Sequence, residues 1–354
     1  MRIDEIDQNL KVDANIRLDD VIWLSPKNAP FSIHGLCETE LDMPYHRVPQ
    51  SVAKETSVGV EELMWHTAGG RIRFATNSPY IAIKAIQPET ETCPDMAKAG
   101  HSGFDLFTTR FGKTTYTATY MPPYGVTGGY ESCAWVSGEM VTYTIGMPLY
   151  DGVNELYIGL KKGSEIAPAE PYMYEKPVLY YGSSITQGGC ASIPGTAYQA
   201  IISRKYDADF INLGFSGNAK AEKAMVEYLA SLDVSVFVCD YDHNAPNAEY
   251  LEATHWPLYE TYRAANPDTP IVFVTRPDFY SPWANTPKRW TVIHETWRKA
   301  KAAGDNNVYF IDGRELFAGD CWDICTVDGC HPNDLGFYRM AQGIGDVVGK
   351  LLTK

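Results

Sequence analysis

Residues Val234 to Asp240 read VSVFVCD, a mostly apolar run that ends in an aspartate. A short run rich in β-branched residues is typical of a strand buried on both faces of a parallel sheet. Similar runs occur at 178–181, 209–213, 270–275 and 307–311, and helical patterns occupy 197–206, 219–231, 247–265, 287–303 and 333–352. Strands that alternate with helices predict an α/β domain with a central parallel sheet covered on both faces.

The preceding half of the chain has a different periodicity. Apolar and polar residues alternate at 71–76 and 80–86, and further short runs follow at 104–108, 114–120, 140–145 and 155–160. This pattern predicts antiparallel strands in an all-β sandwich, of the jelly-roll kind. A segment rich in proline and polar residues follows. We therefore expect a β-sandwich domain at 1–165, a linker at 166–176 and the α/β domain at 177–354.

Composition excludes several classes of partner. The net charge is −14 and no cluster of basic residues occurs, which disfavours nucleic acid and anionic membranes as partners. The polar, acidic start is not a signal peptide, and no apolar stretch is long enough for a membrane helix. The sequence as it stands predicts a cytoplasmic protein; removal of a leader would make it secreted or periplasmic. It does not indicate an oligomeric state.

The eight cysteines do not predict a metal site. Most are scattered, and the group Cys321, Cys325 and Cys330 lacks the CxxC spacing that is common in zinc sites. We expect no metal and no cofactor, and we leave open a disulfide within this group.

Polar loops follow the first three predicted strands of the α/β domain, at the edge of the sheet where reactive groups collect. The first loop reads GSSIT and places Ser184 on a tight turn before a helix, where developing negative charge is favoured. The second contains Ser216-Gly217-Asn218, whose glycine lets the backbone N–H approach a ligand. The third reads DYDHNAP and offers Asn244 as a neutral amide donor.

The loop before the last helix carries the most specific pattern, DGCHPND at 328–334. Asp328 and His331 lie three residues apart, so the carboxylate can hold one ring nitrogen while the other accepts a proton from a serine. We expect Asn333 or Asp334 to cap the helix that follows.

Together these four loops resemble the blocks of the SGNH (GDSL-type) hydrolases, in the same order and over residues 177–354. The resemblance implies a flavodoxin-like three-layer domain and a serine hydrolase that cleaves a small acyl ester. By position, Ser184 resembles the nucleophile, His331 the general base and Asp328 the acid that orients it. The backbone N–H groups of Ser184 and Gly217 and the side chain of Asn244 resemble the oxyanion hole.

Three further comparisons with that family bear on the chain. Ser183 stands where the family usually has an aspartate, and DYDHN replaces the usual GxND, so the substrate class is in doubt more than the activity. The segment SGFDLF at 102–107 resembles the GxDLY motif of β domains that precede some SGNH esterases. It offers Asp105 either for the domain interface or the mouth of the active site, or for a turn or strand edge.

For the substrate we favour an acetylated sugar or oligosaccharide, which would make the protein a carbohydrate O-acetylesterase. Candidate substrate contacts are Arg276, His243, Asp242 and Tyr280, with Trp283 and Trp290 as aromatic neighbours. Arg276 would alternatively pair with Asp278, His243 would be structural, and Trp290 would pack between helix and sheet. A non-catalytic glycan-binding protein, a lipase or thioesterase of the same family, and a metal-dependent phosphoesterase are the alternatives.

Overall fold

The structure is a computed structural model that describes residues 3–8, 11–37, 43–88, 93–278 and 286–353. The chain divides into two compact units, each built from three segments. The β unit comprises Met1–His46, Trp65–Pro171 and Ser192–Gly195, and the α/β unit comprises Arg47–Met64, Tyr172–Ala191 and Thr196–Lys354. Each unit is described by itself below.

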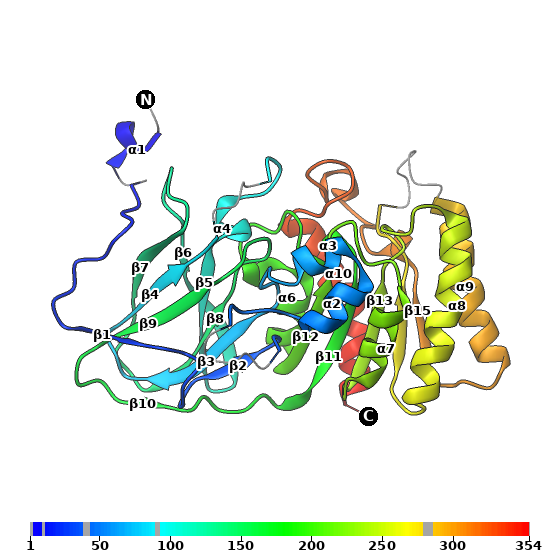
Figure 1. Cartoon of the computed structure of the whole chain (residues 1–354), viewed down its shortest axis with the longest axis horizontal. Coiled ribbons are helices and arrows are strands. Elements are labelled where there is room, and N and C mark those ends of the chain that lie inside the picture. Colours follow the sequence, from blue (N-terminus) through cyan, green and yellow to red (C-terminus); the bar gives the residue numbers. More distant parts are fainter. Residues whose placement is uncertain (1–2, 9–10, 38–42, 89–92, 279–285, 354) are drawn as a thin grey trace. The chain divides into compact units, whose positions relative to one another are not determined.

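The β unit contains two antiparallel sheets (Figure 1). One has the order β1 (Val21–Leu24), β9 (Glu155–Lys161), β4 (Tyr80–Ile86) and β7 (Gly129–Trp135). The other has the order β10 (Ile166–Ala167), β3 (Arg71–Thr76), β8 (Val141–Gly146), β5 (Phe104–Arg110) and β6 (Lys113–Tyr120), with β2 (Ser32–His34) also paired to β3. The short helices α1 (Ile3–Ile6) and α4 (Lys98–His101) belong to this unit.

Both sheets of the β unit contribute to one hydrophobic core. Phe74 of β3 and Leu106 of β5 come from one sheet, and Ile83 of β4 and Ile158 of β9 come from the other. This arrangement is that of a β-sandwich, and the six strands predicted from alternation are all present. The sequence reading did not predict β1, β2, β7 or β10, because these strands are short or have no regular alternation.

The α/β unit has a five-stranded parallel sheet with the order β12-β11-β13-β14-β15 (Figure 1). Its strands are β11 (Tyr174–Gly182), β12 (Ala208–Gly214), β13 (Val236–Asp240), β14 (Ile271–Val274) and β15 (Val308–Ile311). Its longer helices are α6 (Tyr198–Tyr206), α7 (Lys223–Ser231), α8 (Ala248–Ala265), α9 (Thr286–Ala302) and α10 (Asp334–Leu352). All ten lie where the sequence predicted them, within a few residues at their ends.

The strand order identifies the fold as flavodoxin-like, as predicted. The connection from β11 to β12 runs one way along the sheet, and those from β12 onward run the other way. Because such crossovers are right-handed, the reversal places α6 on one face and α7, α8 and α9 on the other. Packing of α7 on α8 and of α8 on α9 agrees with this, and α10, which follows the last strand, packs on α6. A crevice is therefore expected where β11 and β13 end.

The chain crosses between the two units several times, so a single linker does not account for their connection. The segment expected to be a linker instead contributes β10 to the β unit and the first residues of β11 to the α/β unit. Segment 47–64 contains two helices, α2 (Gln50–Thr56) and α3 (Val58–Leu63), that the sequence reading did not predict. It belongs to the α/β unit although it precedes β3 in the sequence. None of the described helices is long and apolar enough to cross a membrane.

Asp105, from the GxDLY-like segment, is a buried residue of β5. Its Oδ2 accepts a hydrogen bond of 2.5 Å from the backbone N–H of Gly195. A Cβ atom on either Gly146 or Gly195 would collide with the Asp105 carboxylate, so these two glycines leave the space that it fills. Of the two roles considered for Asp105, the described contacts are those of a strand residue that anchors the segment Ser192–Gly195.

We expect Asp105→Ala to destabilise the protein by about 1–3 kcal/mol, since the buried Gly195 N–H would lose its acceptor. The measurement is the free energy of urea unfolding. Asp13→Ala, which removes an exposed aspartate of the same unit, is the control and is expected to change stability little. Equal stabilities for Asp105→Ala and Asp13→Ala would contradict this account.

Candidate active site

The end of β11 places Ser184 at the start of a short helix, α5 (Ser184–Gln187). A Cβ atom on Gly182 would collide with the carbonyl of Asp240 on the neighbouring strand, so glycine is required for this close approach. Ser183 is the N-cap of α5, and its Oγ accepts a hydrogen bond of 3.2 Å from Ile185 N–H. Serine in this position therefore performs the capping for which aspartate is also suited.

Three polar side chains form a relay in the α/β unit. Ser184 Oγ lies 2.9 Å from His331 Nε2, and His331 Nδ1 lies 2.7 Å from Asp328 Oδ2. The carboxylate of Asp328 holds the proton on Nδ1, which leaves Nε2 to accept the hydroxyl proton of Ser184. This is the geometry that activates a serine nucleophile.

The loop that carries His331 is held by its own backbone. Val327 N–H donates to His331 carbonyl oxygen at 2.9 Å, and Gly329 adopts a positive φ of 85° in the turn between them. Asp328 Oδ1 also accepts backbone N–H groups from Cys330 at 2.9 Å and from His331 at 2.7 Å. Burial alone would raise the pKa of Asp328, but these hydrogen bonds and the imidazole lower it, so the carboxylate stays ionised. Of the two predicted caps of α10, Asn333 and Asp334, the structure has Asn333, whose side chain accepts a hydrogen bond from Gly336 N–H.

The loop after β12 carries the second candidate oxyanion donor. Asn218 N–H donates to Phe215 carbonyl oxygen at 2.9 Å, which closes a turn with Gly217 inside it. Gly217 has a φ of 68°, a conformation that glycine adopts without strain. Ser216 N–H donates to Gln187 Oε1 at 2.9 Å, so this loop is tied directly to the helix of Ser184. We call residues Phe215–Asn218 the oxyanion loop.

Asn244, the third candidate donor, is held against the oxyanion loop. Its Nδ2 donates to Phe215 carbonyl oxygen at 2.7 Å, and its backbone N–H donates to Tyr241 carbonyl oxygen at 3.0 Å. A carboxamide nitrogen carries two hydrogens, so one stays for another acceptor while the first fixes the side chain.

A cavity of about 1140 Å³ opens beside these groups in the α/β unit. Its lining includes Gly217 and Asn244 from the candidate oxyanion hole and Asp328 from the relay. Phe317 and Trp322 supply aromatic wall, and Arg276 and Arg314 supply guanidinium groups. The volume is that of a site for a whole small molecule, far larger than an acetyl group alone needs.

His243 also lines this cavity, but both of its ring nitrogens face carboxylates. Nε2 lies 2.9 Å from Asp278 Oδ1, and Nδ1 lies 3.3 Å from Asp242 Oδ1. Arg276 holds Asp278 through two hydrogen bonds, from Nε at 2.8 Å and from the second guanidinium nitrogen at 2.5 Å. Burial would lower the pKa of His243, but the two carboxylates raise it well above its ordinary value. His243 is therefore a cation inside an ion-pair network and has no ring nitrogen left to act as a second base.

The ion-pair network shows what two of the expected substrate contacts, Arg276 and Asp242, bind within the protein. Arg276 pairs with Asp278, the alternative that the sequence left open, and it also lines the cavity. Asp242 is fully buried, and its Oδ2 accepts the backbone N–H of Arg276 at 3.2 Å. Because the Asp242 side chain has no exposed surface, a substrate in the cavity does not reach it. The expected substrate contact of Asp242 is therefore wrong, and its role is structural.

Two groups of side chains in this region hold enough ligand atoms for a metal ion. They are Asp240 with Asp242 and His243, and His243 with Asp278 and Cys330. The Arg276 guanidinium already neutralises Asp278, which disfavours a second cation there. For Asp240, burial and the charge of Asp242 raise the pKa well above its ordinary value, so a proton can neutralise the first group. Ion pairs and a proton thus balance the carboxylate charges of these two groups.

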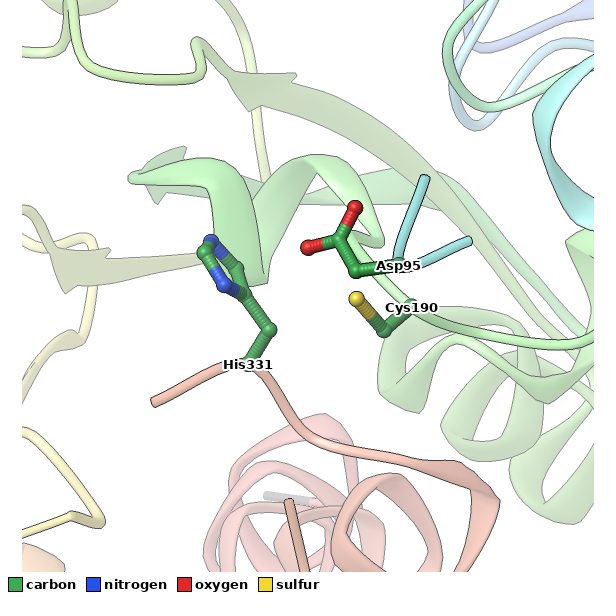
Figure 2. A group of neighbouring side chains, drawn as sticks. All are labelled: Asp95, Cys190 and His331. Atoms are coloured by element: carbon green, nitrogen blue, oxygen red, sulfur yellow. The ribbon is translucent and has the colours of Figure 1, made fainter. Parts of the chain in front are cut away.

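Further residues of the sequence reading are placed as follows. Trp290 packs between α9 and β15, with its ring 5.8 Å from Phe310 and 4.6 Å from His294, which is the packing role predicted for it. Tyr280 and Trp283 lie outside the described residues. All eight cysteines are free thiols. Among them, Cys190 lies within 4.8 Å of a ring nitrogen of His331 (Figure 2), a proximity that its scattered place in the sequence did not indicate.

The ion-pair network around His243 predicts a pH-dependent stability. Because the pKa of His243 is raised, its charge stabilises the fold fully below about pH 6.5, the ordinary pKa of histidine. This stabilisation is lost as the pH rises through the pKa of the folded state. Burial raises the pKa of Asp278, but His243 and Arg276 lower it by more, so its net pKa is below the ordinary value. The Asp278 carboxylate therefore stabilises the fold above about pH 4, and this stabilisation is lost in acid. The network therefore contributes most between these two limits.

We expect Asp278→Asn to lower the pKa of His243 and to destabilise the protein most between about pH 4 and 6.5, with a smaller difference on either side. The measurements are imidazole NMR titration and unfolding free energies across pH. The exposed Asp268→Asn serves as control and is expected to leave both unchanged. A pH-independent stability difference would refute the assignment of these charges.

The parallel sheet and the Ser184–His331–Asp328 relay at its carboxyl edge define a serine-type ester hydrolase of the SGNH kind. Comparison with known proteins agrees. The model of the GDSL-like lipase/acylhydrolase family matches residues 175–349, and the model of the GxDLY N-terminus of SGNH-hydrolase-type esterases matches residues 21–166.

Solved structures with the same fold match the chain across both units. A GDSL-like lipase from Bacteroides ovatus is 30% identical, with a TM-score of 0.84 over 94% of this chain and 98% of that one. A salicylyl-acyltransferase from a tetracycline biosynthetic pathway is 17% identical, with a TM-score of 0.75 over 93% and 96%. An acetyl xylan esterase from the rumen bacterium Butyrivibrio proteoclasticus is 14% identical, with a TM-score of 0.58 over 94% and 99%. No curated protein matches significantly. The chain belongs to the GDSL-like lipase/acylhydrolase family and is an ester hydrolase.

Proposed function

We propose that this protein is a carbohydrate O-acetylesterase that works through an acyl-enzyme on Ser184. The observation that carries the proposal is the continuous relay from Ser184 Oγ through His331 to Asp328, beside a cavity lined by Gly217 and Asn244. A relay of this geometry serves a nucleophile, and the cavity offers room for the alcohol part of an ester.

In the first half of the reaction, Ser184 Oγ attacks the ester carbonyl carbon while His331 Nε2 takes its proton. The carbonyl oxygen becomes an oxyanion, which the N–H groups of Ser184 and Gly217 and the amide of Asn244 stabilise. The tetrahedral intermediate then collapses: the bond to the alcohol oxygen breaks, and His331 returns the proton to the leaving alcohol.

In the second half, water replaces the alcohol. His331 takes a proton from water, the resulting nucleophile attacks the acyl carbon, and the bond to Ser184 Oγ breaks as the proton returns to it. Asp328 stabilises the imidazolium that forms in both halves, and the backbone N–H groups on its Oδ1 hold the carboxylate in place meanwhile. The products are a carboxylic acid and the free alcohol.

The cavity supports a sugar as the alcohol. Aromatic faces such as those of Trp322 and Phe317 pack on pyranose rings, and guanidinium groups such as that of Arg276 donate to hydroxyl oxygens. The acetyl xylan esterase with the same fold acts on a substrate of this class. A volume of about 1140 Å³ is consistent with a sugar residue or a short oligosaccharide together with its acyl group.

Ser184→Ala is expected to lower kcat for p-nitrophenyl acetate by about 10⁴-fold or more, because the acyl-enzyme cannot form. The measurement is release of p-nitrophenol by pure protein, with Ser231→Ala at the exposed end of α7 as control. Retention of activity in Ser184→Ala would remove the nucleophile from the proposal.

Asn244→Ala is expected to lower kcat by about 10²- to 10³-fold with a small change in KM, since the donor acts mainly on the oxyanion. Steady-state kinetics with the same ester test this, and the exposed Asn306→Ala is the matched control. A rise in KM at constant kcat would assign Asn244 to ground-state binding instead.

The sugar is tested by release of acetate from a panel of acetylated monosaccharides, oligosaccharides and polysaccharides, compared with p-nitrophenyl esters of longer acyl chains. Preference for long chains would favour a lipase or thioesterase. Binding of glycans by a protein that hydrolyses none of these esters would favour a glycan-binding protein.

A further inference from the structure

Arg47 is among the largest fully buried side chains of the described residues, with 1% of its surface exposed. It begins the segment Arg47–Met64, which precedes the main part of the β unit in the sequence yet belongs to the α/β unit. Nothing in the sequence around Arg47 indicates a role in the site, because the four hydrolase blocks lie more than a hundred residues further on.

The guanidinium of Arg47 binds the carboxyl end of β12. One of its terminal nitrogens donates to the carbonyl oxygens of Gly214 at 2.5 Å and Asn212 at 3.3 Å. The other donates to the carbonyl oxygen of Leu63 at 2.8 Å. The guanidinium also lies 4.5 Å from the centre of the Phe215 ring, at cation–π distance. One side chain thus joins segment 47–64 to the residues that lead into the oxyanion loop.

The same segment contacts the far end of the oxyanion loop. A Cβ atom on Gly59 of α3 would collide with the carboxamide of Asn218, so helix and side chain are in close contact. Asn218 Nδ2 in turn donates to Ser216 carbonyl oxygen at 2.8 Å. Helix α2 of the segment packs on α7, which follows the loop in the sequence. Segment 47–64 therefore supports the loop at both of its ends.

We propose that Arg47 is a positioning residue for the oxyanion hole. It fixes Phe215 through the preceding carbonyl oxygens and the ring. The Phe215 carbonyl oxygen is the acceptor that holds the Asn244 amide, and it also closes the turn that presents Gly217 N–H. Arg47 thereby sets the positions of two of the three proposed donors without touching the substrate. This inference rests on the proposed function, because it concerns the oxyanion hole assigned there.

The chemistry of arginine fits this role better than that of lysine. A guanidinium is planar and directs donors along fixed lines, so it can bridge several carbonyl oxygens and stack on a ring at the same time. A lysine ammonium offers a point charge without the plane. Because oxyanion donors must be placed within a few tenths of an ångström, the loss of this clamp acts on the transition state more than on substrate binding.

The test compares Arg47→Met and Arg47→Lys in the full chain. We expect kcat for p-nitrophenyl acetate to fall about 10- to 10²-fold in Arg47→Met and roughly 3- to 10-fold in Arg47→Lys, with KM nearly constant. Lys54→Met removes an exposed cation from α2 of the same segment and is expected to match wild type.

A second readout distinguishes positioning from loss of fold. A phenylboronic acid forms a tetrahedral adduct with an activated serine, and its affinity is expected to fall in parallel with kcat/KM in the Arg47 variants. Phe215→Leu keeps the backbone carbonyl but removes the ring, and it is expected to give an intermediate loss, so it carries the test if Arg47→Met does not fold. Thermal unfolding of each variant is measured alongside.

Folded Arg47→Lys and Phe215→Leu proteins with wild-type kcat and boronate affinity would overturn the proposal. That result leaves the proposed function standing, because Ser184→Ala decides it separately. Conversely, a wild-type protein that hydrolyses no ester overturns the proposed function, and this inference with it.

Discussion

The site depends on one topological constraint: the direction of the chain along the sheet reverses after β12. Right-handed crossovers place the helix after β11 on one face of the sheet and the helices after β12 and β13 on the other face. The loops after these three strands therefore meet at one edge of the sheet instead of being covered by a helix. Ser184, the oxyanion loop and Asn244 each come from one of these loops. The direct bonds between them, Ser216 N–H to Gln187 and Asn244 to the Phe215 carbonyl, are consequences of that convergence. Only the His331 loop arrives from elsewhere, just before α10, and it is fixed by its own turn.

Much of this arrangement could be predicted because it is local in the sequence. Each parallel strand is a short apolar run, each helix has its own period, and Asp328 and His331 are three residues apart. The α/β fold and the Asp328–His331 part of the relay therefore follow from patterns within a few residues, and the family resemblance added Ser184. The segment around Arg47 could not be predicted this way. Its helices are short, and its partners on β12 are distant in the sequence, so no local period or motif connects them. Strands β1, β2, β7 and β10 were missed for the related reason that pairing with distant strands, more than their own residues, makes them strands.

The departure from the usual GxND block has a physical explanation in the structure. Where a glycine would leave space, Asp242 and His243 fill it with charge, and Asp278 and Arg276 from the end of β14 complete the ion pairs. Buried charges cost desolvation energy, which an interaction partner must offset, so each member of this network depends on the others. The sequence reading identified the departure and gave Arg276, His243 and Asp242 as candidate substrate contacts, with an Arg276–Asp278 pair and a structural role for His243 as the alternatives. Pairing between residues more than thirty positions apart was not visible from one chain, and it leaves Arg276, His243 and Asp278 as members that are paired and also line the cavity.

The support of the oxyanion loop by segment 47–64 bears on how the two units are connected along the chain. The α/β unit takes the segment Arg47–Met64 from between two segments of the β unit, so the two units alternate along the sequence. If Arg47 positions Phe215, a catalytic fragment that begins at β11 lacks a part of its own unit, although it contains every residue of the four hydrolase blocks. The relay of Ser184, His331 and Asp328 would be complete in such a fragment, while the acceptor that holds Asn244 would have lost its clamp. The residues that perform the chemistry and those that fix its geometry are thus separated in the sequence, and the family's motifs identify only the first kind.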